Sequence, residues 1–184
     1  PPPSSVRNPT PFPGAITAPL AYPNVAPIAD RVVVIGSSTG GPSALDAVMR
    51  ALPAKPNYGV ILVQHMSAAL TSALAARLDG LGSFRVKQAA DGDRVRVGVA
   101  LLAPGDRHLG MVAGSVRMND DAPVHGVRPA VDVTMKAVAA VYGAKAVGVV
   151  LTGMGRDGAL GLASMKTSGG RTLAQDQATS VVFG

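Results

Sequence analysis

Three polar residues with the side chains of a hydrolytic triad follow three apolar segments of this chain. Ser38 lies in a turn of the pattern G-x-S-x-G, His65 comes just after an apolar run, and Asp157 lies in the glycine-rich loop 152–158. A serine hydroxyl becomes a good nucleophile when an imidazole takes its proton, and a carboxylate fixes the tautomer of that imidazole. These residue types predict acyl-transfer chemistry, provided that the fold brings the three side chains together.

The segment 31–42, RVVVIGSSTGGP, is the strongest of these signals. The β-branched run from Val32 to Ile35 predicts a buried strand, and Pro42 with apolar residues at helical spacing after it predicts a helix. A strand, a glycine turn and a helix make a nucleophile elbow, and the free N–H groups of the helix N-terminus suit an oxyanion. A phosphate cradle uses a similar connection, but this turn lacks the G-x-G-x-x-G spacing and the lysine of a P-loop.

Each candidate also has a purely structural interpretation. A histidine at the end of a strand often serves only as a hydrogen-bonding residue, and Asp157 could simply cap the helix that follows it. The other two histidines are His108, which could be satisfied by Asp106 in the same turn, and His125, which lies in a predicted loop. Ser37 is a second hydroxyl next to the predicted nucleophile.

Composition limits the classes of protein that this chain can be. Its 184 residues, 47% of them hydrophobic, predict one α/β domain over 31–184, preceded by a proline-rich interdomain linker over 1–30. No cysteine is present, which excludes disulfides and thiolate metal sites and agrees with a reducing cytoplasm. The net charge is +6, but the basic residues are scattered without a Lys/Arg-rich run, so no nucleic-acid partner is expected, and an acidic protein surface suits this charge equally well. No apolar run approaches the ~20 residues of a membrane span, and no membrane insertion is expected.

From residue 31 onward, apolar runs alternate with amphipathic segments. We expect strands at 32–36, 59–64, 85–88, 96–103, 146–151 and 171–174, helices at 42–51, 68–78, 131–142 and 158–168, and a hairpin of 109–113 with 116–118. Strands separated by helices predict a doubly wound, mostly parallel sheet with helices on both faces. We expect the antiparallel hairpin at an edge of this sheet.

In such sheets ligands bind beyond the carboxyl ends of the strands. Ser38 follows the first predicted strand, His65 follows the second, and Asp157 lies in the connection after the strand 146–151. The three side chains are therefore expected at one edge of the sheet. Their chain order, Ser, His, Asp, differs from the Ser, Asp, His order of α/β-hydrolases, so another fold is indicated.

Five blocks of the sequence together resemble the catalytic domain of the bacterial chemotaxis protein-glutamate methylesterases. The blocks are GSSTGG from Gly36, QHM from Gln64, LAPGDRHL from Leu102, LTGMGRDGA from Leu151, and QD with ATSVVFG near the end. They occur in order over residues 31–184. In that family a response-regulator receiver domain precedes the catalytic domain through a linker, and the family continues for a short segment beyond the position of Gly184.

The resemblance implies a cytoplasmic enzyme that hydrolyses glutamate γ-methyl esters on the cytoplasmic helices of chemoreceptors and deamidates certain glutamines there. It assigns Ser38 as the nucleophile, His65 as the general base and acid, and Asp157 as the residue that orients the imidazole. Met154, through its backbone N–H, and Thr39 would hold the oxyanion. No metal or organic cofactor is implied, and the partners are the methylated receptors and the receiver domain.

The chain departs from the family pattern at Ser37, where a small alanine is common, and in the loop 124–132, which matches the substrate-side segment of the family with changes. Three other functions stay open from the sequence. A phosphate- or nucleotide-binding module would explain the glycine turn but not His65 and Asp157. An inactive receptor-binding domain and a general small-ester hydrolase are the remaining alternatives.

Overall fold

The structure is a computed structural model in which residues 26–184 are described. Most of the predicted linker, residues 1–30, therefore lies outside the described residues. Its last residues already belong to the folded body, because Ile28 forms a β-bridge with Arg96 and the Ala29 N–H donates to the Val95 carbonyl at 2.9 Å.

The helices and strands lie close to the predicted positions. They are β1 (Val32–Ser37), α1 (Gly41–Ala51), β2 (Gly59–Gln64), α2 (Ala68–Asp79), β3 (Arg85–Gln88), β4 (Val99–Leu102), β5 (His108–Val112), β6 (Ser115–Asn119), α3 (Val131–Tyr142), β7 (Ala146–Val150), α4 (Ala159–Thr167) and β8 (Arg171–Ala174). A short 3-10 helix, η1 (Gly143–Lys145), joins α3 to β7. No helix between residues 26 and 184 is long and apolar enough to cross a membrane.

Six strands form one sheet in the order β3-β4-β2-β1-β7-β8, and all of their pairings are parallel. The strand β1 lies between β2 and β7, with Gly36 level with Val63 on one side and Val150 on the other. The three strands that carry the predicted catalytic connections are thus adjacent, and they end at nearly the same level. The predicted doubly wound parallel sheet is confirmed.

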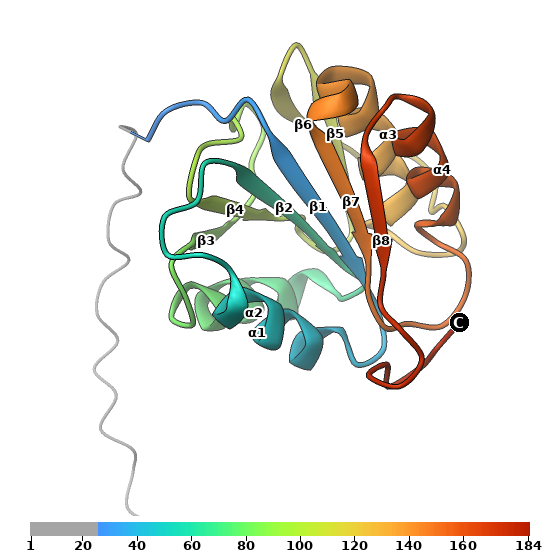
Figure 1. The fold of residues 1–184 in the computed structure, drawn as a ribbon. Coiled ribbons are helices and arrows are strands. Elements are labelled where there is room, and N and C mark those ends of the chain that lie inside the picture. Colours follow the sequence, from blue (N-terminus) through green and yellow to red (C-terminus); the bar gives the residue numbers. More distant parts are fainter. Residues whose placement is uncertain (1–25) are drawn as a thin grey trace, which may run out of the picture.

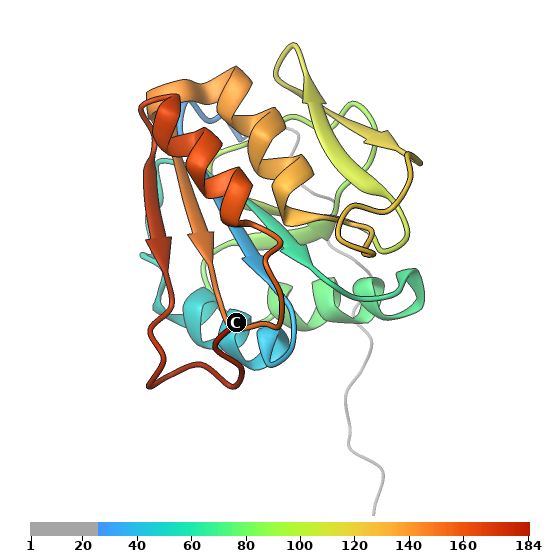
Figure 2. The same ribbon diagram turned by 90° about the vertical axis from the view of Figure 1, so that its right-hand side faces the viewer.

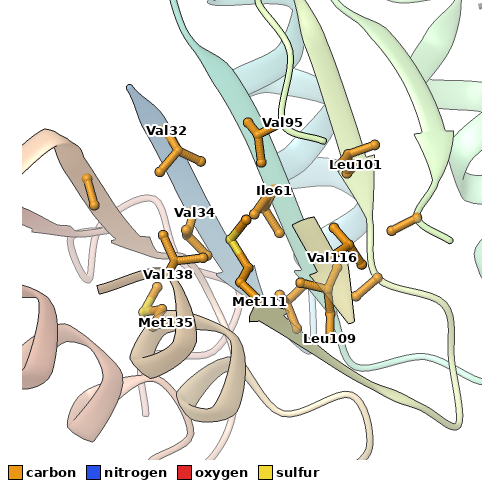
Figure 3. Close-up of a cluster of buried hydrophobic side chains, with 14 of the residues drawn as sticks. Val32, Val34, Ile61, Val95, Leu101, Leu109, Met111, Val116, Met135 and Val138 are labelled. Carbon is orange, nitrogen blue, oxygen red and sulfur yellow. The ribbon is translucent and has the colours of Figure 1, made fainter. Parts of the chain in front are cut away.

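Helices cover both faces of the sheet (Figure 1). The side chains of each central strand alternate between two cores, as the period of two in a strand requires. In β1, Val34 enters the core beneath α3, and Ile35 enters the core beneath α1 and α2. Both faces are buried, which explains why the sequence of β1 is continuously apolar rather than alternating. Figure 3 shows the first core, where Val34 and Ile61 of the sheet meet Met135 and Val138 of α3.

The hairpin β5-β6 is present, but it is not attached to an edge of the parallel sheet as predicted. It forms a separate two-stranded antiparallel sheet that packs beside α3 (Figure 2). Its apolar residues Leu109, Met111 and Val116 are buried in the same core as Ile61, so the hairpin covers this core on the side of α3. The predicted strand 96–103 shortens to β4, which is an inner strand of the parallel sheet.

Candidate active site

The connections after β1, β2 and β7 meet at the carboxyl ends of the strands. There Ser38, His65 and Asp157 line one hollow of about 170 Å³, together with Met154. The structure therefore brings the three side chains to one hollow, as the order of the strands predicts. Thr39 lies in the same turn as Ser38 but not on the wall of this hollow.

The elbow after β1 separates the two adjacent serines. Ser37 is the last residue of the strand, only 3% exposed, and its hydroxyl donates to Gln64 Oε1 at 2.7 Å. Ser38 follows the strand, faces the hollow, and its hydroxyl has no hydrogen-bond partner among residues 26–184. The turn is possible because Gly40, the N-cap residue just before α1, has a φ of +82°, which glycine adopts without a Cβ clash. Ser38 is thus the accessible hydroxyl and Ser37 a structural one.

The loop after β7 approaches the elbow very closely. The Ser38 N–H donates to the Thr152 carbonyl at 3.0 Å, and a Cβ on Gly153 would lie 2.8 Å from the Ser38 Cβ. A side chain at this position would push the loop away from the serine, which explains the glycine. The contact brings the exposed residue Met154 to the rim of the hollow.

His65 and Asp157 form a short hydrogen bond between Nε2 and Oδ2 at 2.7 Å. Their side chains are 14% and 4% exposed. Burial raises the pKa of Asp157, but hydrogen bonds from His65 and from the backbone N–H groups of Asp132 and Val131 together lower it by more, so the pKa lies below the usual aspartate value. The carboxylate therefore stays ionised at neutral pH and holds a proton of the imidazole on Nε2. That tautomer leaves Nδ1 as the basic nitrogen.

Asp157 does cap a helix, but not the one that follows it in the chain. The N-cap position of α4 is Gly158, and within residues 26–184 the Asp157 carboxylate accepts no hydrogen bond from that helix. The carboxylate instead accepts hydrogen bonds from the N–H groups of Val131 at 2.7 Å and Asp132 at 2.9 Å, in the first turn of α3. The positive end of α3 thus helps to keep the carboxylate ionised.

The C-terminal residues brace the site through contacts that the sequence did not predict. Gln175 Oε1 accepts from the Thr152 N–H at 2.8 Å, and the Gln175 amide nitrogen donates to the Thr179 carbonyl at 2.9 Å. The Thr152 hydroxyl is bonded to the carbonyls of Thr39 and Val182. These contacts join separate loops, so spacing along the chain could not have found them. The signals in the sequence were a threonine just after an apolar strand and the C-terminal block that carries the family resemblance.

The other two histidines have different surroundings. His108 is 1% exposed and does not pair with Asp106, contrary to the interpretation from the sequence. Its Nδ1 accepts from the Ala130 N–H, and its Nε2 bonds the Ala122 carbonyl, so it fastens the loop that leads into α3. The carboxylate of Asp106 instead accepts from the Ala68 N–H at the start of α2. His125 lies in the predicted loop, and its ring contacts α3 through Asp132.

One cluster between residues 26 and 184 has ligand types that suit a metal ion. His125, Asp132 and Asp157 offer ligand atoms within 4.8 Å of one another. Both carboxylates already accept backbone N–H groups, however, and a cation would have to displace those donors. The arrangement is that of helix caps rather than of a cation site.

Comparisons with known proteins agree with this geometry. The family described as CheB methylesterase matches residues 33–184. A protein-glutamate methylesterase/protein-glutamine glutaminase of Symbiobacterium thermophilum is 50% identical over 155 residues, which cover 84% of this chain and 43% of that protein. Another protein of this name, from Anaeromyxobacter dehalogenans, is 51% identical over 159 residues, covering 84% of this chain and 44% of its own length.

A solved structure agrees as well. The catalytic domain of the Thermotoga maritima CheB methylesterase superimposes with a TM-score of 0.78 at 44% identity, and 84% of each chain is covered. The chain thus spans less than half the length of the two curated relatives but most of that catalytic domain. By sequence and by fold, the chain belongs to the CheB methylesterase family.

Proposed function

We propose that this chain is the catalytic domain of a protein-glutamate methylesterase and glutaminase that acts on methylated chemoreceptors. The single observation that carries the proposal is the convergence of Ser38 and the His65–Asp157 pair on one hollow at the carboxyl end of the sheet. The names of the relatives point to the same reaction. A phosphate-binding module would have no use for the buried histidine–aspartate pair.

The proposed reaction begins with attack of Ser38 Oγ on the ester carbonyl, while Nδ1 of His65 takes the hydroxyl proton. The tetrahedral oxyanion is held by the backbone N–H groups of Met154 and Thr39, which belong to the apposed loop and to the residue after the nucleophile respectively. The bond to the methoxy group then breaks, and His65 returns the proton to release methanol. Water attacks the acyl-enzyme by the same route and regenerates the serine. A glutamine side chain would release ammonia instead.

The shape of the site supports a polypeptide substrate. The hollow of about 170 Å³ offers room for one side chain rather than for a large ligand. Two large exposed apolar residues line it, Met154 at 78% and Phe183 at 60% exposure. Such a rim suits the face of a protein helix. The net charge of +6 also favours an acidic, glutamate-rich surface.

The relatives are more than twice as long as their matched region, which leaves room for the receiver domain that the resemblance implies. We infer that this domain and the cytoplasmic helices of the receptors are the partners of the protein. Activity of the present chain alone would show that catalysis does not require the receiver.

The test is methanol release from a receptor fragment that carries methylated glutamates. We expect release from the methylated fragment, none from the unmethylated one, and ammonia from a fragment that carries glutamine at the same positions. A small methyl ester serves as the comparison. Equal turnover of the small ester and the receptor would favour a general esterase, and no turnover of either by folded protein would contradict the proposal.

A further inference from the structure

The N-termini of α3 and α4 are each capped by a carboxylate from the N-terminal region of the other helix. Asp157, just before α4, accepts from the N–H groups of Val131 and Asp132 in α3. Asp132, in the first turn of α3, accepts at Oδ1 from the N–H groups of Gly158 at 3.0 Å and Gly161 at 2.6 Å, where α4 begins. Each helix thus starts on a carboxylate supplied by the other, where the helix dipoles favour negative charge.

Asp132 is the more deeply buried of the two, with 1% of the residue exposed. Its second oxygen, Oδ2, is 2.8 Å from His125 Nε2 in the loop before α3. A buried carboxylate is costly unless its oxygens are bonded, and here both oxygens have partners. This leaves Asp132 a single orientation, fixed by α4 on one side and by His125 on the other.

Two bonds connect Asp132 with the dipeptide Asp157–Gly158. The Asp132 N–H donates to the carboxylate of Asp157 at 2.9 Å. The Asp132 carboxylate also holds the N–H of Gly158, the next residue in the chain after Asp157. The backbone and the side chain of Asp157 are therefore both held in place by Asp132. Asp157 in turn holds His65 at 2.7 Å.

We propose that Asp132 is a positioning residue for the reaction, and that it keeps Asp157 aligned with His65. His125 supports it by holding the second carboxylate oxygen. The inference rests on the function proposed above, since it assumes that the His65–Asp157 pair serves catalysis. Asp132 does not line the hollow that holds Ser38, so its removal should leave substrate binding intact.

The two informative variants are Asp132→Ala and Asp132→Asn. Alanine leaves the N–H groups of Gly158 and Gly161 without an acceptor, which allows the turn that carries Asp157 to shift. Asparagine keeps an acceptor oxygen for both. We expect kcat of the alanine variant to fall ~10²-fold, as a small misplacement of a catalytic group can cause, with KM unchanged. The asparagine variant should recover most of the loss.

The measurements are kcat and KM on methylated receptor, together with the rate at which a fluorophosphonate labels Ser38, since labelling reports the serine and histidine without the receptor. Ser38→Ala is the control in both assays, and circular dichroism checks folding. An alanine variant that is folded and labels as fast as wild type would overturn the proposal. So would an asparagine variant as impaired as alanine, or a loss confined to KM.

If the alanine variant does not fold, the exposed residue His125 carries the test. His125→Ala should slow the labelling of Ser38. His125→Gln, which keeps a donor for Asp132, should restore the labelling rate. An alanine variant that labels as fast as wild type would overturn the proposal. The proposed function fails in a different way. If wild type labels at Ser38 but releases no methanol, the proposed substrate is wrong. If wild type does not label at Ser38, both proposals are wrong.

Discussion

The two ends of the parallel sheet each have a hollow, and the two hollows differ in size and in the side chains that line them. The larger hollow, about 600 Å³, lies at the amino ends of the strands and is lined by Arg31, Lys145 and Arg171 among others. The hollow at the carboxyl ends is about 170 Å³ and contains Ser38 and the His65–Asp157 pair. The smaller space thus holds the three side chains for which we propose acyl-transfer chemistry.

The difference follows from the direction of the helices. α1 and α4 begin just after β1 and β7, so their N–H groups and positive dipole ends lie at the carboxyl ends of the strands. The first turn of α3 lies there too, because it donates to Asp157. At the amino ends the chain arrives from helix C-termini, whose carbonyl groups favour cations. The helix N-termini therefore favour negative charge at the carboxyl ends of the strands.

Ser38→Ala should have the largest effect and would sharpen this contrast most. Turnover should fall by ~10⁴-fold or more, because the variant lacks the hydroxyl proposed as the nucleophile. Arg171→Gln at the amino end is the matched control and should leave turnover unchanged. Methanol release from methylated receptor measures both. Activity that survives in Ser38→Ala and disappears in Arg171→Gln would place the chemistry at the amino ends of the strands.

His65→Gln should lower turnover by ~10³-fold or more without unfolding the protein, since glutamine cannot take the serine proton. His108→Gln is the comparison. It should affect stability before activity, because the His108 ring is buried and bonds the Ala122 carbonyl and the Ala130 N–H, away from the hollow. Thermal melts beside kcat would separate the two effects, and a selective loss of kcat in the His108 variant would show that the wrong base has been named.

Asp157→Asn should lower kcat by ~10²- to 10⁴-fold, through loss of the charge that fixes the imidazole tautomer. It should also change the response of stability to acid. The folded-state pKa of Asp157 is below the ordinary value of 3.8, so the unfolded chain binds the proton first as the pH falls. The stability from this carboxylate is fully present above the unfolded pKa and is lost as the pH falls through the folded one.

The melting temperature of wild type should therefore fall more steeply than that of the asparagine variant below about pH 5. Thermal melts from neutral pH down to about pH 3 would measure the difference. Parallel curves for the two proteins would mean that the hydrogen bonds to His65, Val131 and Asp132 do not stabilise the ionised form.

Ser37→Ala should have the smallest effect on catalysis. It removes the donor to Gln64 Oε1 and leaves a buried acceptor unsatisfied, which costs about 1–3 kcal/mol of unfolding free energy. Ser38 keeps its place through its bond to Thr152, so most of the turnover should remain. Denaturant unfolding and methanol release test the two statements, and loss of turnover without loss of stability would make Ser37 the nucleophile.

Local patterns determined much of this protein. The apolar runs of β1, β2 and β7 predict buried parallel strands, and the parallel arrangement by itself places the residues after them at one edge. Ser38, His65 and Asp157 could therefore be selected from the sequence. The boundaries of the strands and helices differ from the predicted ones by a few residues, because the chain frays gradually at the end of an element.

Other features depended on distances between residues far apart in the chain, which no local pattern encodes. The sequence could not place the hairpin β5-β6, because its apolar face fits an edge of the sheet or a helix equally well, and only the packing beside α3 decides. It predicted neither the burial of Ser37 against Gln64 nor the exchange of Asp132 and Asp157 between two helix N-termini. These carboxylates bond N–H groups 25 to 29 positions away. Tertiary packing brought the polar groups together, because a buried carboxylate takes whichever donors the fold provides.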